Sequence, residues 1–173
     1  MLDTKSIENL IVAINDYPKQ GVVFRDITPL FQHPQAIESI IDDLAEFAKT
    51  LNIDAIAGAE SRGFLFGVPL SLKLNKPFIL IRKPNKLPRE VYRESYDLEY
   101  GSSTVEMHKD AIQPGQRVLI IDDLLATGGT VGAIEKLIKK AGGTVAGSAF
   151  LIELEALNGR QKLEGQVYSI LKY

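Results

Sequence analysis

One stretch of the chain, residues 118–130, constrains the fold more than any other. It opens with four aliphatic residues, 118–121, which are too few for a helix and show no polar alternation, so they are typical of a strand buried on both faces. Apolar residues then recur at the spacing of one helix face between 131 and 141, and Gly142 and Gly143 end the pattern. A buried strand that leads through a short loop into a helix is a building unit of parallel sheets.

The link between this strand and this helix has the composition of an anion-binding loop. Gly128 and Gly129 allow backbone N–H groups to turn toward an anion, and the helix N-terminus adds partial positive charge. Thr127 and Thr130 add hydroxyl donors. The loop has no lysine and no G-x-G-x-x-G pattern, so it is neither a Walker A loop nor a dinucleotide fingerprint. We therefore predict a phosphate cradle of a different kind at residues 126–130.

Two carboxylates, Asp122 and Asp123, lie between the strand and this loop. They would repel a bare phosphate, but they suit a ligand that carries hydroxyls, a metal or a developing cation a few ångströms from its phosphate. A ribose 5-phosphate meets this condition if its 2′- and 3′-hydroxyls face the acids. The alternative is a tight turn whose acids only cap the helix, although a cap needs one acid and contributes only ~1 kcal/mol.

Length and composition limit the remaining possibilities. A chain of 173 residues with 45% apolar and 24% charged residues is typical of one globular domain, residues 1–173. A net charge of −2 argues against nucleic acid or an anionic membrane as the main partner, and the absence of cysteine excludes disulfides and thiolate chemistry. We see neither a signal peptide nor an apolar run of about 20 residues, so we expect a cytoplasmic protein.

Strand-like apolar runs alternate with helical patterns along the chain. The strand-like runs lie at 53–58, 77–81, 118–121 and 144–154, and the helical patterns at 37–51, 64–74 and 131–141. Such alternation predicts an α/β fold, a mainly parallel twisted sheet flanked by helices. We also expect a short helix at 7–14, capped by Asp3 or Thr4, and an edge strand at 167–171.

Ligands of open parallel sheets bind beyond the carboxyl ends of the strands, where three loops should converge. One is the loop after residue 121, a second is 58–63, and a third begins at residue 82. Arg62 suits a pyrophosphate site because its guanidinium can bind two oxygens at once, although a surface ion pair is the simpler reading.

Residues 82–101 lack a core face and hold five basic residues, so they favour a lid or a loose hairpin with a returning strand at 103–107. The alternative is an ordinary solvated charge run. Near the N-terminus, the composition around Phe24 favours a plug at the edge of the core over a wall of a base pocket.

Residues 118–130 resemble the 5-phosphoribosyl-1-pyrophosphate (PRPP) signature of the type I phosphoribosyltransferases. Together with residues 21–29, 60–67, 80–83 and 95–101, they are similar to the adenine-specific branch of that family, and the resemblance covers the chain from about residue 17 to residue 173. It implies the type I phosphoribosyltransferase fold, with a small hood at about 1–30 and a flexible lid at about 82–105. It also implies purine salvage, in which 5-phosphoribosyl passes from PRPP to adenine to give AMP and pyrophosphate. Two alternatives stay open, namely another purine base and a PRPP-sensing regulator.

The resemblance further implies three sets of binding residues. The 5′-phosphate and ribose of PRPP would be bound by Asp122, Asp123, Ala126, Thr127, Gly128, Gly129 and Thr130. Pyrophosphate would be bound by Glu60, Ser61, Arg62, Arg82, Lys83, Lys86 and Tyr100. Adenine would be bound by Val23, Phe24, Arg25 and Leu124, with Val23 and Arg25 acting through their backbone groups and Phe24 and Leu124 stacking on the ring.

Two catalytic residues and several partners are implied in the same way. Arg62 would stabilise the leaving pyrophosphate, and Glu99 would transfer a proton at the base. A non-proline cis peptide is expected within residues 60–62, and a homodimer is implied. Because His33, His108 and the acids show no metal-ligand spacing, we expect no protein-held metal, and Mg²⁺ would arrive with PRPP and keep most of its waters.

Overall fold

The computed structural model describes residues 2–97 and 101–173, and the chain divides into two compact units, Met1–Asp43 and Leu44–Tyr173. The second unit contains every described segment that was predicted to bind PRPP. The single domain at 1–173, with its hood at 1–30 and its lid at 82–105, stays a prediction.

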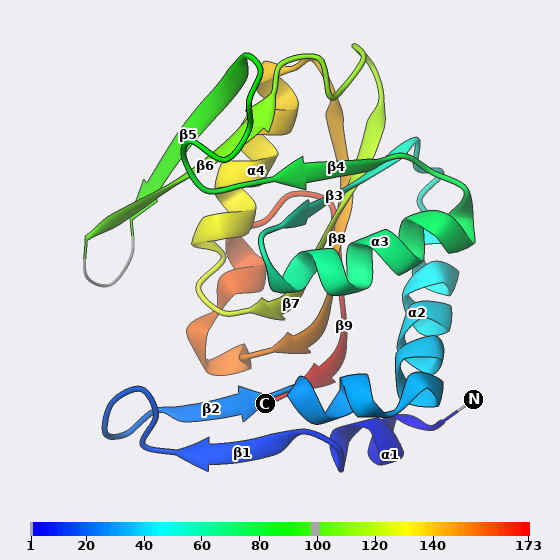
Figure 1. The fold of residues 1–173 in the computed structure, drawn as a ribbon, viewed down its shortest axis with the longest axis vertical. Coiled ribbons are helices and arrows are strands. Elements are labelled where there is room, and N and C mark those ends of the chain that lie inside the picture. Colours follow the sequence, from blue (N-terminus) through cyan, green and yellow to red (C-terminus); the bar gives the residue numbers. More distant parts are fainter. Residues whose placement is uncertain (1, 98–100) are drawn as a thin grey trace. The chain divides into compact units, whose positions relative to one another are not determined.

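In the N-terminal unit, the short helix predicted to reach residue 14 is present but ends early. Helix α1 spans only Thr4–Glu8, with Asp3 as its N-cap, and the Asp3 side chain accepts a backbone hydrogen bond at 2.8 Å. Strand β1 (Val12–Asn15) then pairs antiparallel with β2 (Val23–Asp26), as Figure 1 shows in blue. The β-branched side chains of β1 suit a strand, and the pairing with β2 is a non-local contact that helical spacing of apolar residues cannot reveal.

Helix α2 connects the two units. A 3₁₀ helix, η1 (Thr28–Gln32), leads to α2 (Pro34–Lys49), which begins at Pro34, a residue suited to the first turn of a helix. Near the carboxyl end of α2, the Phe47 ring stacks on Tyr168 with ring centroids 4.9 Å apart.

The C-terminal unit contains a five-stranded sheet in the order β4-β3-β7-β8-β9, and all four neighbouring pairs are parallel. The strands are β3 (Ala55–Ala59), β4 (Phe78–Ile81), β7 (Arg117–Leu125), β8 (Thr144–Glu153) and β9 (Gln166–Lys172). This confirms the predicted fold class and places β9 at an edge. The side chains of β7 from 118 to 121 are fully buried, as a strand covered on both faces requires.

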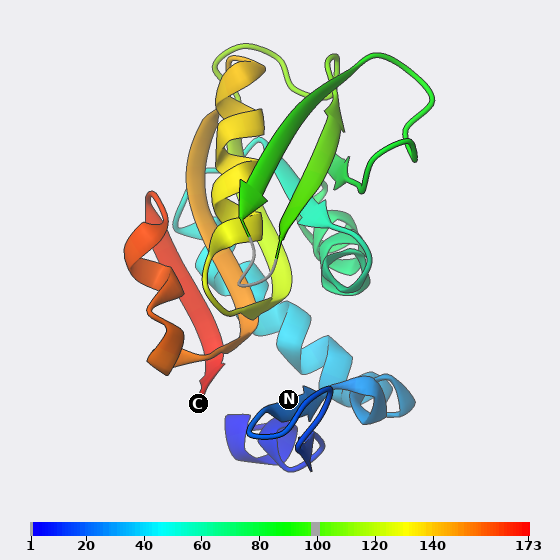
Figure 2. The ribbon, with the colours of Figure 1, turned by 90° about the vertical axis from the view of Figure 1, so that its left-hand side faces the viewer.

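Helices cover both faces of this sheet. Helix α3 (Arg62–Leu74) connects β3 to β4, and α4 (Gly129–Lys140) connects β7 to β8. Because these two connections step in opposite directions across the sheet, right-handed crossovers put the helices on opposite faces, as Figures 1 and 2 show. Helix α3 continues through Pro69, although proline has no backbone N–H to donate within a helix.

The segment after β4 forms a hairpin. Strand β5 (Val91–Asp97) pairs antiparallel with β6 (Ser102–His108), and the hairpin packs against α4 (Figure 2). The returning strand predicted at 103–107 is therefore confirmed. Arg82 is tied to β6 by an isolated bridge to Glu106, which fixes the point where the hairpin leaves the sheet.

Within 2–97 and 101–173, no helix is both long and apolar enough to cross a membrane. Over the same residues, no cluster of three or more His, Cys, Asp or Glu side chains could hold a metal ion.

Candidate active site

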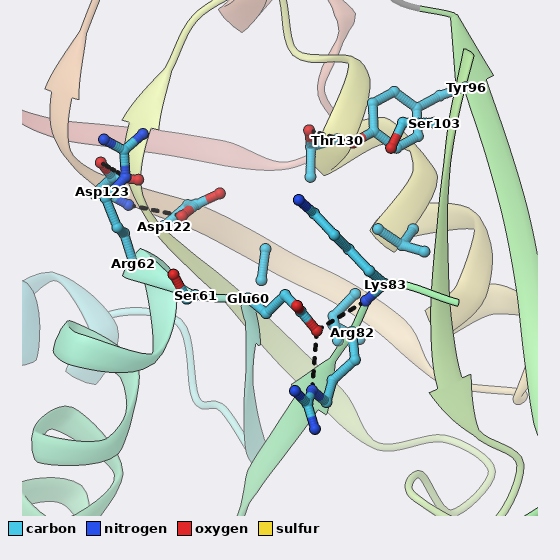
Figure 3. A pocket seen from close by; sticks show the side chains of 13 residues that line it. Glu60, Ser61, Arg62, Arg82, Lys83, Tyr96, Ser103, Asp122, Asp123 and Thr130 are labelled. Carbon is cyan, nitrogen blue, oxygen red and sulfur yellow. Dashed lines mark hydrogen bonds and ion pairs between the residues drawn. The ribbon is translucent and has the colours of Figure 1, made fainter. Parts of the chain in front are cut away.

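The segments after β3 and β4, the carboxyl end of β7 and the start of α4 meet around one cavity of about 140 Å³, which Figure 3 shows from close by. The β5–β6 hairpin adds side chains to the same cavity. The lining residues are Ala59, Glu60, Ser61, Arg62, Ile81, Arg82, Lys83, Tyr96, Ser103, Val105, Asp122, Asp123 and Thr130. The structure therefore confirms that the three predicted segments converge at the carboxyl edge of the parallel sheet.

The two carboxylates belong to β7 itself and do not follow it. The strand runs to Leu125, beyond the end at residue 121 that the aliphatic run predicted, because β8 continues to pair with it through Leu125 and Glu153. Adjacent strand residues point to opposite faces, so Asp122 and Asp123 have different neighbours. The Asp123 side chain, 8% exposed, forms an ion pair with the Arg62 guanidinium at 2.9 Å. The Asp123 amide donates a hydrogen bond to Asp122 Oδ1 at 2.9 Å.

Burial makes these acids hard to ionise. It raises the pKa of Asp122 well above its usual value, and the charge of Asp123 raises that pKa further. Burial also raises the pKa of Asp123, but the Arg62 guanidinium opposes this rise. Because Arg62 favours the ionised form of Asp123, a proton held by the pair belongs on Asp122.

The loop between β7 and α4 has the geometry of an anion cradle. Gly128 has φ 80°, a left-handed conformation that favours glycine, and α4 begins at Gly129. Amides in the first turn of a helix have no intrahelical acceptor and can therefore bind an anion. Residues 126–131 line a second hollow of about 80 Å³, and Asp122 lines both hollows. The cradle and the acids are thus adjacent, as a ribose 5-phosphate would require.

Glu60 holds two residues from the neighbouring loop. Its Oε2 accepts hydrogen bonds from Arg82 Nε and from the Lys83 amide, each at 2.9 Å (Figure 3). Burial alone would raise the pKa of Glu60, but the Lys83 amide and the Arg82 guanidinium outweigh it and hold the pKa below its usual value. The peptide bond between Glu60 and Ser61 is cis, as expected. An ionised Glu60 can act on a pyrophosphate only through the cations that it positions.

Comparison with known proteins decides the family. Residues 27–172 match the family described as the phosphoribosyl transferase domain. The chain belongs to the phosphoribosyltransferase family. A relative from Ureaplasma parvum serovar 3, named adenine phosphoribosyltransferase, is 64% identical over 173 residues that cover 100% of both chains.

Two solved phosphoribosyltransferases are also similar along the whole chain. The crystal structure of adenine phosphoribosyltransferase from Thermoanaerobacter pseudethanolicus has a TM-score of 0.95 and 46% identity, and the match covers 98% of this chain and 99% of that one. The Saccharomyces cerevisiae adenine phosphoribosyltransferase, solved with an imino-altritol bisphosphate and adenine, has a TM-score of 0.91 and 36% identity, covering 96% and 97%.

Most residues predicted to bind PRPP in this phosphoribosyltransferase are brought together. Arg62, Arg82 and Lys83 share the larger cavity with Asp122 and Asp123. The described lining of that cavity does not include Lys86, whose backbone carbonyl accepts a long, 3.4 Å hydrogen bond from Arg82. Predicted residues Glu99 and Tyr100 lie outside the described residues.

The predicted adenine residues belong to different units. Val23, Phe24 and Arg25 are in β2, whereas Leu124 is in β7. Within the first unit, the Phe24 ring makes an edge contact with Tyr17, with ring centroids 5.2 Å apart. The adenine assignment stays a prediction.

Sequence reasoning did not select two residues of the cavity as site residues, Tyr96 and Ser103. Thr130 Oγ1 donates a hydrogen bond to the Tyr96 hydroxyl at 3.0 Å, so the hairpin contacts the phosphate loop directly. Both residues lie on the hairpin strands, and the register that turns them inward depends on packing against α4, which no local pattern encodes.

Proposed function

We propose that this phosphoribosyltransferase transfers 5-phosphoribosyl from PRPP to adenine, which yields AMP and pyrophosphate in purine salvage. The observation that carries the proposal is a pair of adjoining hollows, one lined by the phosphate loop and the other by two acids and three cations, with Asp122 lining both. The full-length similarity to adenine phosphoribosyltransferases supports adenine as the base.

In this reaction N9 of adenine attacks C1 of the ribose as pyrophosphate leaves, so positive charge grows on the ring and negative charge grows on the leaving group. The amides of residues 127–130 and the hydroxyls of Thr127 and Thr130 would bind the 5′-phosphate. Asp122 and Asp123 would accept hydrogen bonds from the ribose hydroxyls and stabilise the nearby positive charge. The protein thereby holds both reactants in line, which can contribute several kcal/mol toward the barrier.

The leaving group would be stabilised by the cations that line the cavity. Arg62, Arg82 and Lys83 would bind pyrophosphate oxygens, while Ser61 would donate from its hydroxyl and Glu60 would position the two cations after β4. Lys86 and Tyr100 would complete the pyrophosphate site, and Glu99 would transfer the proton at the base when residues 82–105 close. Closure would exclude water, which otherwise hydrolyses a ribosyl cation.

Phe24 and Leu124 are the proposed stacking residues for adenine, and backbone groups of Val23 and Arg25 would read its edge. The Saccharomyces cerevisiae relative was solved with adenine, which supports this base for the present chain. Backbone recognition leaves little trace in residue identity, so a base panel is the sharpest test.

Magnesium fits the donor set as a companion of the substrate. Asp122 and Asp123 are the only acidic side chains besides Glu60 among the described residues that line the cavity, and Glu60 is already paired. Mg²⁺ would supply charge neutralisation for the leaving group, held mainly by phosphate oxygens and water. Because PRPP is a highly charged metabolite of the cell interior, we also propose a cytoplasmic location.

A homodimer is supported by an apolar stripe on α3. Leu65, Val68 and Leu72 lie on one face of that helix with exposed fractions of 45%, 43% and 77%, and Leu80 of the edge strand β4 is also exposed. Exposed apolar side chains gathered in this way are typical of protein–protein contacts.

The function is tested by incubating the purified chain with PRPP, Mg²⁺ and one of adenine, hypoxanthine, guanine or xanthine, followed by chromatography of the nucleotides. We expect AMP, with adenine preferred by at least a hundredfold in kcat/KM. Faster turnover of another base would reject adenine specificity. A thermal shift with PRPP but no nucleotide product from any base would instead indicate a PRPP-sensing regulator.

A further inference from the structure

The phosphate loop, residues 126–130, packs against a glycine from near the carboxyl end of the chain. A Cβ atom placed on Gly159 would lie 2.2 Å from the carbonyl oxygen of Ala126 and 3.0 Å from the amide nitrogen of Gly128. Both atoms belong to the backbone, so neither can move aside as the tip of a flexible side chain could. The φ angle of Gly159 lies outside the left-handed region, so lack of space, and not backbone conformation, excludes a side chain here.

The contact is equally tight from the side of the loop. A Cβ atom on Gly128 would lie 2.9 Å from the Gly159 carbonyl oxygen. The two backbones thus approach each other through a pair of glycines, and one Cα hydrogen of Gly159 points at the Ala126 carbonyl, a weak hydrogen-bond geometry. The loop is therefore supported at the peptide that precedes its anion-binding amides.

The turn that carries Gly159 is itself anchored to the sheet. Gly159 begins the 3₁₀ helix η3 (Gly159–Lys162), and the next residue, Arg160, forms a two-pronged ion pair with Glu153 at the end of β8. Arg160 Nε lies 2.9 Å from Glu153 Oε1, and the guanidinium also donates to the Val167 carbonyl on β9. Glu153 is 4% exposed, so its carboxylate is held away from bulk solvent, whereas the Arg160 side chain is 37% exposed.

Glu153 also connects the turn to the strand that carries the acids. It pairs in register with Leu125 of β7, the residue immediately before the phosphate loop. The turn, the ends of β8 and β9 and the loop are therefore joined by one continuous set of contacts, part backbone pairing and part the Arg160 side chain.

We propose that Gly159 is a positioning residue for the 5′-phosphate: its bare Cα, fixed by the Arg160–Glu153 pair, sets the position of the Ala126–Gly128 backbone that binds the phosphate. This inference rests on the proposed function only for the identity of the loop's ligand. Gly159→Ala would push the Ala126 carbonyl away by about 1 Å, and a misplacement of that size can lower a reaction rate roughly a hundredfold.

The test compares Gly159→Ala with Gly132→Ala, the same chemical change in the first turns of α4, where a Cβ atom meets nothing within 4 Å. Isothermal titration would measure the Kd of ribose 5-phosphate and, separately, of magnesium pyrophosphate. We expect Gly159→Ala to weaken ribose 5-phosphate binding by 10- to 100-fold while pyrophosphate binding changes less than threefold. Gly132→Ala should leave both values unchanged. Equal binding of ribose 5-phosphate by the two variants would overturn the proposal, and so would a parallel loss of both ligands.

A second variant, Arg160→Lys, tests the same proposal if Gly159→Ala does not fold. It retains the charge but loses the two-pronged geometry, so ribose 5-phosphate binding should weaken by about three- to tenfold with pyrophosphate binding retained. Unchanged ribose 5-phosphate binding in this variant would contradict the anchoring role of the pair.

These outcomes are separate from the fate of the proposed function. If the wild-type chain binds ribose 5-phosphate but makes no AMP from adenine, the function fails while the comparison of the two glycine variants still holds. If the wild-type chain makes AMP and both variants bind ribose 5-phosphate alike, the function stands and the role of Gly159 is rejected.

Discussion

The surroundings of Asp122 disfavour the ionised form of its carboxyl group. A half-buried carboxylate beside a second carboxylate costs free energy in the folded protein, and the hydrogen bond from the Asp123 amide and the nearby Arg62 guanidinium relieve only part of that cost. A hydroxyl-bearing ligand would use the hydrogen-bond acceptors that burial leaves poorly solvated. If Asp122 binds a ribose hydroxyl as proposed, it favours binding at the expense of stability.

Asp122→Asn should stabilise the folded chain and weaken its binding of ribose 5-phosphate. The folded-state pKa of Asp122 is raised above its unfolded value, so its contribution to stability is greatest at low pH and is lost as the pH rises through the folded-state pKa. Asparagine cannot ionise, so the gain in Tm should be larger at pH 8 than at pH 5. For a chain of this length, a change of about 1 kcal/mol in the free energy of unfolding corresponds to a Tm shift of ~2–4 °C. Calorimetry at the two pH values checks this. A Tm gain that is larger at pH 5 would contradict it.

Arg62→Ala should lower kcat/KM by roughly 10²–10³ if Arg62 stabilises the leaving pyrophosphate. The variant also leaves the buried Asp123 without this guanidinium, so a modest fall in Tm is expected without loss of the fold. Steady-state kinetics and a thermal melt separate the two effects, with Lys49→Ala as a control for loss of an exposed charge. A kcat/KM within threefold of wild type would remove Arg62 from the mechanism.

At the scale of elements, the close packing of α3 on the sheet depends on missing side chains. The Phe78 ring fills a hollow between two glycines, since a Cβ on Gly67 would lie 2.3 Å and one on Gly58 2.6 Å from its ring atoms. The Phe64 ring meets Phe78 edge-on, with centroids 5.8 Å apart, which leaves the ring little room to move. This packing fixes the start of α3, and with it Arg62.

Gly67→Ala should destabilise the fold by about 1–3 kcal/mol through overpacking. Replacing Phe78 by leucine in the same chain should recover part of that loss, because the smaller side chain vacates the position of the new methyl group. Chemical denaturation of the two single variants and the double variant measures the coupling. Additive effects would show that Phe78 is not the obstacle.

Elements were predictable from sequence where their signal was local. The run 118–121 and the helix after residue 130 were found because burial on both faces and helical spacing both show in the residue pattern. The continuation of β7 to Leu125 depends on pairing with β8, and the strand β1 depends on pairing with β2. Both pairings are non-local contacts, so the local residue pattern predicted too short a strand at β7 and a helix in place of β1.

The same distinction holds within the site. The acids, the phosphate loop and Arg62 were predicted because each is a short motif whose chemistry is visible in its residues. The roles of Tyr96 and Gly159 arise from contacts between segments more than 30 residues apart, Tyr96 with Thr130 and Gly159 with Ala126. Such contacts follow only once the sheet order and its crossovers are known.

At the scale of the whole molecule, the exposed stripe on α3 predicts self-association. Leu72→Asp should shift the chain toward the monomer, since a charge at a contact between copies is desolvated without a partner. Sedimentation at several protein concentrations checks this, with Gln35→Asp as a control that makes the same change in charge at an exposed position of α2. A wild-type chain that sediments as a monomer at all concentrations would reject the dimer.

We propose above all that the loop after β7 binds a sugar phosphate beside the acid pair. A crystal structure of the chain with AMP tests it most directly. We expect the phosphate to lie against the amides of residues 127–130, with the ribose hydroxyls within hydrogen-bond distance of Asp122 or Asp123. A nucleotide phosphate bound at any other place on the molecule would contradict the account.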